Sequence, residues 1–406
     1  MPIVVLAIAE WFGTALWFTP NAVIDDLQRL WSLAPGDIGW LTGAVQLGFL
    51  LGTLTIGLSG LADRIDAARL FTVACLIGAL SNALLPFAGG LETASALRMM
   101  TGLALAGIYP IGMKLMVGWA PGRAGLGLSW LVGMLVLGTA MPHLLAALAD
   151  IGVTQGASPA TDWRSTLWLA SLLALLGGAG VWRLGEAPRN RGAARPHNAS
   201  TSGLRAFGIA DFRRAAGAYF GHMWELYTLW AALPLLLGSA VESLSPRALA
   251  LTSFGLIAIG APGCWLGGWC SQHLGSRAVA QAGLIGSVVC AALYPLLAPQ
   301  LAPAWLIALL ASWSLFAVID SPHFSALSAK ACPPPLLGSA LTLQNAIGFG
   351  ISALSVALLL PLLPSLGPWL GWCLLPGPLL ALLALKAPRS RRSCPLRSRP
   401  RGSRPR

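Results

Sequence analysis

The sequence predicts an all-helical membrane protein, with twelve transmembrane helices arranged in two pseudo-symmetric six-helix bundles. Of its 406 residues, 56% are hydrophobic and only 10% are charged, whereas a soluble domain carries about 25% charged residues. Apolar blocks of roughly the 20 residues that a spanning helix needs recur from end to end. These blocks are continuous and do not alternate with polar residues, which favours helices over barrel strands.

A polar stretch in the middle of the chain divides the apolar blocks into two sets of six. It reads "GEAPRNRGAARPHNASTSGLRAFGIADFRRAAG", and its Arg, Pro, Gly and Ser content is typical of a linker between two bundles. We therefore predict a first bundle over 1–185, a cytoplasmic basic linker over 186–213, a second bundle over 214–386 and a disordered basic cytoplasmic tail over 387–406. The expected spans cover 3–24, 38–58, 70–90, 97–119, 125–149, 164–183, 214–238, 248–270, 278–298, 304–328, 337–361 and 366–385.

The positive charge predicts the orientation of the chain. The net charge of +12 comes mainly from eight Arg in the tail and seven Arg between residues 183 and 214. With an even number of spans, 21 of the 26 basic residues fall on the side of the two termini, and only Arg29, Arg164 and Arg247 fall on the other. Both termini are therefore expected in the cytoplasm. The basic segments suit anionic lipid headgroups, and nucleic acid is not expected because no aromatic residues interleave the Arg.

Sequence patterns of enzymes are missing. There is no phosphate-binding G-x-x-x-x-G-K-[ST] loop, no G-x-S-x-G turn, no histidine cluster at zinc spacing and no C-x-x-C pair among the seven Cys. We expect no enzyme activity, no cofactor and no metal. A non-transporting scaffold or a lipid-modifying enzyme stays as an alternative, although such an enzyme would need a sizeable polar loop at the membrane surface.

The loop after the second expected span resembles that of the major facilitator superfamily. The family pattern G-x-L-A-D-R-x-G-R-R is matched by "SGLADRIDAARL", with Ser59 and Asp66 in place of two glycines. The resemblance implies that Asp63, Arg64 and Arg69 form a conformational latch between the two halves. The corresponding loop after the eighth span lacks the Asp and Arg, so a second latch is expected to be weak.

Other segments extend this resemblance over nearly the whole chain. "RMMTGLALAGIYPIGMK" is similar to the family's fourth span, "GMLVLGTAMPHLL" to its fifth and "DWRSTLWL" to the start of its sixth. "GWLTGAVQLGFLLGTL" and "YFGHMWELYTLW" resemble bacterial members loosely grouped with nitrate or cyanate permeases. The resemblance implies a monomeric secondary transporter of the inner membrane, which moves a small solute by alternating access.

Ionisable residues inside the spans follow a pattern. Each costs at least about 2.5 kcal/mol in lipid, so each calls for a reason. Seven of the eight fall on spans one, four, seven and ten, which line the central cavity in the superfamily; His143 is the exception. The eight are Glu10, Arg98, Lys114, His143, His222, Glu225, Asp320 and His323.

Two acid–histidine pairs are the candidates for proton coupling. His222 and Glu225 are three residues apart, as are Asp320 and His323, so each pair projects from one helix face. A carboxyl group beside a histidine in a poorly hydrated cavity can exchange a proton near neutral pH. We expect Glu225 or Asp320 to be the coupling site, with the two histidines as relays. The alternative is that both pairs only hold helices together.

Further polar and aromatic side chains are candidates for the substrate cavity. Arg98 and Lys114 would suit an anionic substrate, although Lys114 could instead extend toward the membrane surface. Trp residues on the cavity-lining spans could stack on a flat substrate or simply pack between helices. The cavity candidates are Glu10, Arg98, Lys114, Tyr109, Trp224, Gln46, Gln344 and Asn345, with Trp11, Trp17 and Trp230 as further stacking residues. His143, beside Pro142, is expected to be structural.

The two acid–histidine pairs favour transport that is coupled to protons. Proton-antiport efflux of drugs or metabolites remains an alternative, because a cavity with charges of both signs suits either direction.

Overall fold

The computed structural model describes residues 2–59, 61–120, 124–153, 162–187, 203–333 and 336–386, and within these ranges its regular structure is entirely helical. The predicted tail and residues 188–202 of the predicted linker lie outside the described residues. The first half of the chain contains α1 (Pro2–Thr14), α2 (Thr19–Ala22), α3 (Ile24–Trp31), α4 (Pro35–Ser59), α5 (Leu61–Arg64), α6 (Ala67–Leu84), α7 (Leu91–Ala106), α8 (Tyr109–Trp119), α9 (Ala124–Val153) and α10 (Asp162–Leu184). The second half contains α11 (Gly203–Ala206), α12 (Ala210–Ala240), α13 (Pro246–Ala258), α14 (Gly260–Leu274), α15 (Ser276–Leu297), α16 (Pro303–Ile319), α17 (Ser321–Ala331), α18 (Leu337–Leu359), α19 (Leu363–Leu366), α20 (Leu370–Leu374) and α21 (Pro376–Lys386).

Ten helical segments among the described residues are long and apolar enough to cross a membrane. The predicted all-helical, multi-span class is therefore confirmed. The first expected span is divided among α1, α2 and α3, and α1 has only 13 residues. The seventh corresponds to the 31-residue α12, which carries His222 and Glu225. The first and the seventh expected spans are not among the ten segments. The count of twelve spans therefore stays a prediction.

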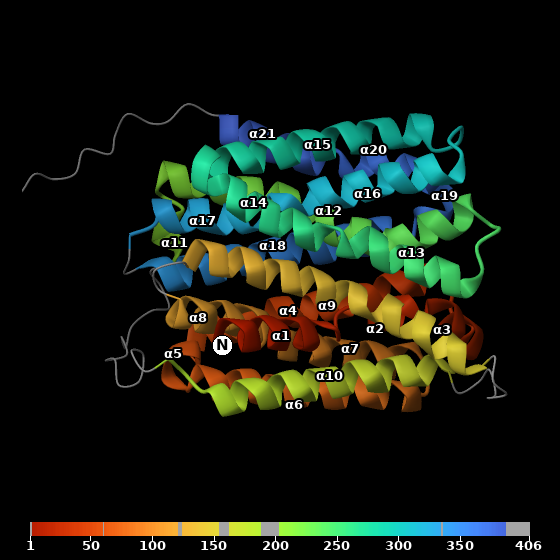
Figure 1. Cartoon of the computed structure of the whole chain (residues 1–406), viewed down its shortest axis with the longest axis horizontal. Helices are drawn as coiled ribbons and strands as arrows, with labels where there is room; N and C mark the ends of the chain where they lie inside the picture. Colours follow the sequence, from red (N-terminus) through yellow and green to blue (C-terminus); the bar gives the residue numbers. More distant parts are fainter. Residues whose placement is uncertain are drawn as a thin grey trace, which may run out of the picture.

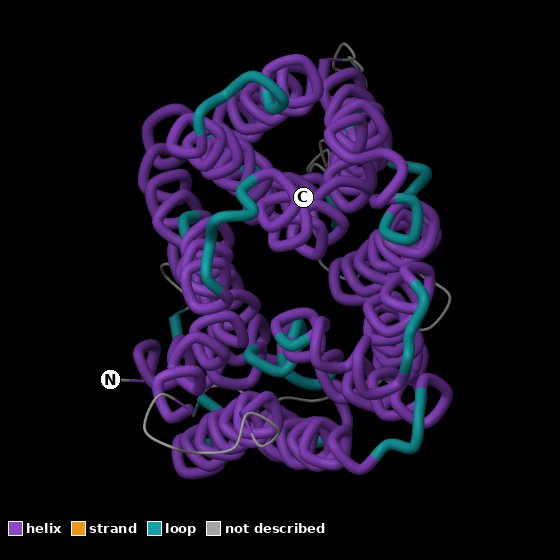
Figure 2. The backbone as a smooth tube through the Cα atoms, turned by 90° about the vertical axis from the view of Figure 1, so that its right-hand side faces the viewer, coloured by secondary structure: helices purple, strands orange, loops and turns teal. Residues whose placement is uncertain are grey.

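The long helices run roughly parallel to one another. In Figure 1, α1 to α10 lie in the lower part of the view and α12 to α21 in the upper part. Seen from the end, most helices run along the line of sight (Figure 2). The two parts meet where α4 packs against α18 and where α9 packs against α13 and α14. Any site near this seam takes side chains from both halves of the chain.

Prolines break several of the helices near mid-span. α7 ends at Ala106 and α8 starts again at Tyr109, with Pro110 in its first turn. In the second half, α16 ends before Asp320 and α17 continues with Pro322 in its first turn. Because proline lacks a backbone N–H and its ring clashes with the preceding turn, a helix tends to be interrupted there. Polar residues at these breaks lie deep inside the protein.

Glycines allow α4 and α7 to approach closely. A Cβ atom at Gly48 would collide with the backbone carbonyl of Met99, and one at Gly102 would collide with the carbonyl of Val45. Small residues at such crossings let helix backbones pack directly against each other, which is how membrane helices gain packing energy. Gly102 of the predicted fourth-span motif thus has a packing role.

A buried carboxylate at the end of α10 holds the start of α6. Glu186 is 6% exposed, and its Oε1 accepts a hydrogen bond from the Ala67 backbone N–H at 2.7 Å. We expect Glu186→Ala to lower the free energy of unfolding by about 1–2 kcal/mol, because a buried helix N-terminal N–H loses its acceptor. Glu186→Gln keeps an acceptor and should lose less. Thermal unfolding of the detergent-purified variants measures both, and equal stability of the alanine variant and the wild type would contradict the capping role.

Candidate functional site

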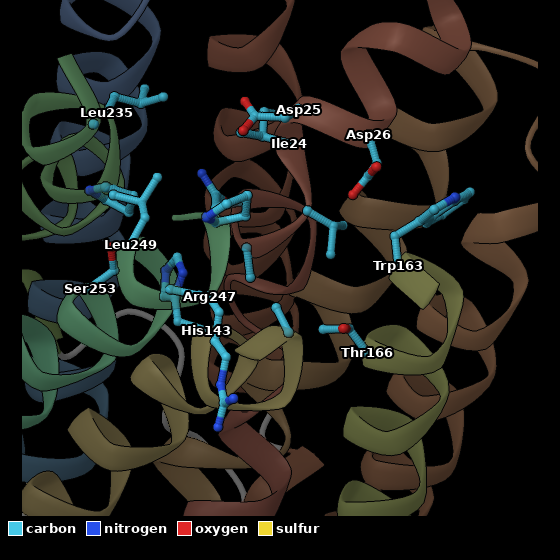
Figure 3. Close-up of a pocket in the computed structure, with 18 of the residues that line it drawn as sticks. Ile24, Asp25, Asp26, His143, Trp163, Thr166, Leu235, Arg247, Leu249 and Ser253 are labelled. Carbon is cyan, nitrogen blue, oxygen red and sulfur yellow. The ribbon is translucent and has the colours of Figure 1, made fainter. Parts of the chain in front are cut away.

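Two cavities lie between the helices of the first and second halves. The larger has a volume of about 860 Å³, within the range typical of ligand sites. Figure 3 shows Asp25, Trp163 and His143 on its first-half walls, and Arg247 and Ser253 on its second-half walls. It lies at the end of the protein where α3 and α13 are found, away from α5 and α17 (Figure 1). His143, expected to be structural, thus lines this cavity.

The smaller cavity is deeper and nearly filled. Its volume of about 20 Å³ leaves room for about one water molecule. None of the residues that line it carries a formal charge, and its polar groups include Tyr109, Ser321 and Ser325. In this conformation the small cavity is therefore closed to any organic solute.

Five aromatic side chains, which we call the aromatic cluster, pack together where the two halves of the chain meet. Trp17 stacks on Tyr227 with ring centroids 5.3 Å apart, and Phe49 lies 4.0 Å from Phe349. Trp230 completes the cluster with its edge against Tyr227 at 5.5 Å. The cluster borders the small cavity through its three second-half rings, and it joins the two halves of the chain.

Glu225 is buried on α12, and one of its carboxyl oxygens accepts two hydrogen bonds. Its Oε1 accepts hydrogen bonds from Ser287 Oγ on α15 at 2.6 Å and from Trp313 Nε1 on α16 at 2.7 Å. The side chain is 1% exposed. Ser287 and Trp313 were not among the predicted site residues, because only the packing of α12 against neighbouring helices reveals them.

His222 and Asp320 form a second buried contact one turn away. His222 Nδ1 lies 3.0 Å from Asp320 Oδ1, and both side chains are 1% exposed. The two atoms are close but not oriented as a hydrogen bond. His222 lies on α12 three residues before Glu225, about one helical turn away. The structure thus brings together three of the four predicted proton-coupling residues.

The fourth predicted proton-coupling residue, His323, faces a different helix. Its Nε2 lies against α14, where a Cβ atom at Gly267 would be 3.2 Å away. The side chain is buried, and Nε2 has no hydrogen-bond partner among the described residues. His323 is three residues from Asp320, yet its ring lies against α14 while Asp320 contacts His222 on α12.

Glu10 lies inside the first-half helices without a hydrogen-bond partner among the described residues. Its side chain is 0% exposed and its two carboxyl oxygens are both unbonded. It packs against α8, where a Cβ atom at Gly112 would collide with Oε2. The structure therefore places this carboxyl away from the large cavity and inside the first half.

Arg98 stabilises the break in the first expected span. Its guanidinium donates to the backbone carbonyl of Leu16 at 3.0 Å, to the carbonyl of Trp17 and to Thr19 Oγ1 at 3.4 Å. These carbonyls lie in the turn between α1 and α2, where they lack helical partners. Only Nε of Arg98 is left unbonded, so most of its donors are occupied without a substrate.

Lys114 and the predicted latch residues lie at the α5 end of the protein. Lys114 Nζ donates to the backbone carbonyl of Ala62 in α5. Arg64 and Arg69 are exposed, while the side chain of Asp63 lies outside the described residues. Asp66, which replaces a family glycine, caps α6 by accepting from the Arg69 backbone N–H at 2.9 Å.

The uncharged cavity candidates divide into bonded and unbonded groups. Trp224 Nε1 donates to the Cys373 carbonyl at 3.0 Å and so points into the second half. Gln46 and Gln344 are buried with no hydrogen-bond partner among the described residues, and Asn345 is half-buried beside Gln344. Among these candidates and Tyr109, only Tyr109 borders one of the two cavities.

An internal repeat was missed in the sequence and becomes clear from the structure. Residues 10–20, "EWFGTALWFTP", and 225–234, "ELYTLWAALP", share the order Glu, aromatic, Thr, Leu-Trp, Pro. The first segment lies in α1–α2 and the second in α12, and the Trp after Leu follows Glu by seven residues in the first and by five in the second. Comparing span one with span seven, instead of the loops alone, would have found it.

Comparison with known proteins identifies the family. The model of the Major Facilitator Superfamily matches residues 4–357, so the chain belongs to this superfamily of membrane transporters. The niacin transporter NiaP of Acinetobacter baylyi is 31% identical over 131 residues, covering 30% of this chain and 29% of NiaP.

Two proteins of Escherichia coli are also similar. The inner membrane metabolite transport protein YgcS of strain K12 is 28% identical over 183 residues, covering 44% of this chain and 38% of YgcS. The uncharacterized transporter YgaY of strain O157:H7 is 28% identical over 190 residues, covering 45% of this chain and 43% of YgaY. The matches thus span less than half the length of each relative.

Proposed function

We propose that this chain is a proton-coupled secondary transporter that moves a small organic solute across the cytoplasmic membrane by alternating access. The single observation that carries the coupling is the buried group of Glu225, His222 and Asp320 on α12 and at the α16–α17 break. Titratable groups at membrane depth are costly, and in transporters they mark proton relays. The proposal includes twelve spans in two pseudo-symmetric bundles, which the internal repeat supports.

The positions of the cavities support a transport cycle. With both termini in the cytoplasm, as the positive charges predict, the large cavity opens to the outside. The aromatic cluster borders the small cavity. Solute would enter the large cavity, pass the aromatic cluster when the two halves rock, and leave toward the cytoplasm.

Niacin and nicotinamide are the first solutes to test. Two of the relatives are named for niacin, although each match covers only part of their length. Aromatic side chains and hydroxyl groups line the small cavity, and such a lining suits a solute with a single polar ring.

The transport test uses purified protein in liposomes with radiolabelled niacin. We expect accumulation above the external concentration when the outside is acidic and the inside neutral, and loss of that accumulation when a protonophore is added. Protein-free liposomes are the control. Equal uptake with and without the pH gradient would contradict proton coupling, and uptake no faster than in the control would contradict niacin as a substrate. Accumulation only under the reversed gradient would assign proton antiport.

A further inference from the structure

Glu10 differs from the other buried carboxyl groups of the described residues, because it has neither a hydrogen bond nor a basic partner. Its side chain is 0% exposed and both of its carboxyl oxygens are unbonded. By contrast, Glu186 and Glu225 accept hydrogen bonds, and Asp320 lies 3.0 Å from His222. Burying a carboxylate without a partner is far more costly than burying the neutral acid. The protonated form of Glu10 is therefore the form that fits this conformation.

The carboxyl group of Glu10 occupies a space that Gly112 leaves on α8. A Cβ atom at Gly112 would lie 2.3 Å from Glu10 Oε2 and 3.6 Å from the ring of Phe71 on α6. The space is thus bounded by a bare backbone and an aromatic ring. A negative charge on Glu10 would favour separation of α1 from α8, because separation lets water reach the carboxylate.

The helices around Glu10 do not offset such a charge with a basic group. Helices α6, α8, α9 and α10 surround this part of α1. Their described titratable side chains are those of Arg69, Cys75, Tyr109, Lys114, His143, Arg164 and Arg183. Lys114 donates to a backbone carbonyl in α5, His143 lines the large cavity, and the arginines lie in the first or last turn of their helices. Among these groups, only the thiol of Cys75 and the phenol of Tyr109 are left to face Glu10.

The position of Glu10 along α1 gives it access from one side of the membrane. With both termini in the cytoplasm, as the positive charges predict, α1 starts at the cytoplasmic surface. Glu10 lies eight residues after Pro2, which is roughly 12 Å along the helix. Toward the outside, Arg98 holds the turn between α1 and α2, and Glu10 lines neither of the two cavities. A proton on Glu10 would therefore exchange with cytoplasmic water.

We propose that Glu10 is a regulatory proton-binding site that senses the pH of the cytoplasm and is separate from the coupling group around Glu225. A proton taken from cytoplasmic water lets α1 pack against α8 and stabilises the form whose large cavity opens to the outside. Release of this proton to the same side destabilises that form. The outward-open form is therefore favoured at low internal pH and loses stability as internal pH rises.

The site sets the speed of the cycle and does not supply its driving force. Because the proton enters and leaves on one side, no proton crosses the membrane through Glu10. Each return to the outward-open form requires that Glu10 is protonated, so the rate of return follows the protonated fraction. The inference rests on the proposed transport function, but solute exchange without net accumulation is enough to test it.

Infrared difference spectroscopy of the purified full chain tests whether Glu10 holds a proton. The spectrum of the wild type minus that of Glu10→Gln should show the carbonyl band of a protonated carboxylic acid at neutral pH. The band should disappear reversibly as the pH is raised. The control is Glu92→Gln, the same change at an exposed carboxylate on α7, which should give no such band at neutral pH. Absence of the band from the Glu10→Gln difference would overturn the proposal.

Exchange in liposomes tests the regulation. External labelled nicotinamide exchanges for internal unlabelled nicotinamide at equal concentrations, while the internal pH is varied and the external pH is fixed. Above a midpoint, wild-type exchange should slow by up to about tenfold for each unit of internal pH, because the protonated fraction falls in that proportion. Glu10→Gln, which stays neutral, should lose this slowing. Equal internal-pH profiles for the two proteins would reject the regulatory role.

A second variant tests the space beside Gly112 while keeping the carboxyl group. Gly112→Ala should slow exchange at every internal pH, because its Cβ atom would occupy the place of Glu10 Oε2. The matched control is Gly43→Ala on α4, where a Cβ atom would have nothing within 4 Å. Wild-type exchange in Gly112→Ala would contradict the packing role. If this variant fails to fold, the Glu10→Gln comparison still decides the proposal.

The regulatory site and the proposed coupling can fail separately. Exchange that responds to internal pH through Glu10, together with no accumulation under a pH gradient, would keep this site and reject the proton coupling. Gradient-driven accumulation with equal exchange profiles in the wild type and Glu10→Gln would do the reverse. If the wild type does not exchange nicotinamide, that solute is rejected, and the infrared spectra decide whether Glu10 binds the proton.

Discussion

Glu225→Gln is expected to abolish solute accumulation driven by a pH gradient while leaving exchange down a concentration gradient intact. Glutamine keeps an oxygen that can accept from Ser287 and Trp313, whose donors lie 2.6 and 2.7 Å from Glu225 in the wild type. It cannot release a proton. The protein should therefore fold and still change conformation, but its movement would no longer be linked to the proton gradient.

The measurement compares two assays on the same liposomes. Uptake under an imposed pH gradient should fall to the level of equilibration, and exchange of internal unlabelled for external labelled solute should continue. The matched control is Glu92→Gln, the same change at an exposed carboxylate in the first turn of α7, which should leave both assays unchanged. Persistent gradient-driven accumulation in Glu225→Gln would reject this residue as the coupling site. Asp320→Asn is expected to act in the same direction, since His222 lies 3.0 Å from Asp320.

Arg98→Met is expected to be the most destabilising single change at the candidate site residues. Its guanidinium donates to the carbonyls of Leu16 and Trp17. The Leu16 carbonyl also accepts from Thr19 Oγ1 at 3.3 Å, but the Trp17 carbonyl would lose its side-chain donor, and a buried acceptor left unpaired costs roughly 1–3 kcal/mol. The turn between α1 and α2 would lose its support, and Trp17, part of the aromatic cluster, would move with it. We expect a loss of roughly 1–3 kcal/mol in the free energy of unfolding.

Arg98→Lys should recover only part of this stability, because one ammonium group cannot reach two carbonyls in the planar fork of a guanidinium. Thermal unfolding of the purified variants measures the effect. Arg247→Met is the control, since Arg247 is exposed. Full stability of Arg98→Met with a selective loss of affinity for an anionic solute would instead support the interpretation of Arg98 as a substrate ligand.

Much of the architecture could be predicted from local composition. Continuous apolar blocks define membrane helices because the bilayer leaves no other partner for the backbone. The interruptions at Pro110 and Pro322 were not predicted, since the expected spans 97–119 and 304–328 run through them. Spacing within one helix also predicted the side chains that lie near one another on α12. The spacing was less informative at the α16–α17 break, where Asp320 contacts His222 on α12 while His323 lies against α14.

The roles of polar residues depended on neighbouring helices. Three side chains carry hydrogen-bond donors that would suit a substrate: Arg98, Lys114 and Trp224. Each of them instead donates to a backbone carbonyl of another segment. Conversely, Ser287 and Trp313 did not stand out in the sequence, because a serine and a tryptophan in an apolar span are ordinary. Their importance comes from the rotation of α15 and α16 toward Glu225.

The sequence by itself determined that this is a helical membrane protein of the major facilitator type with titratable groups in its spans, since length, hydropathy and loop motifs are properties of each segment alone. Only the tertiary structure decided which groups meet: Glu225 with Ser287 and Trp313, His222 with Asp320, and Trp17 with Tyr227 across the two halves. The physical reason is that the direction of a side chain is set by the rotation and packing of whole helices. Contacts between distant helices depend on every close approach along them, including those permitted by Gly48 and Gly102.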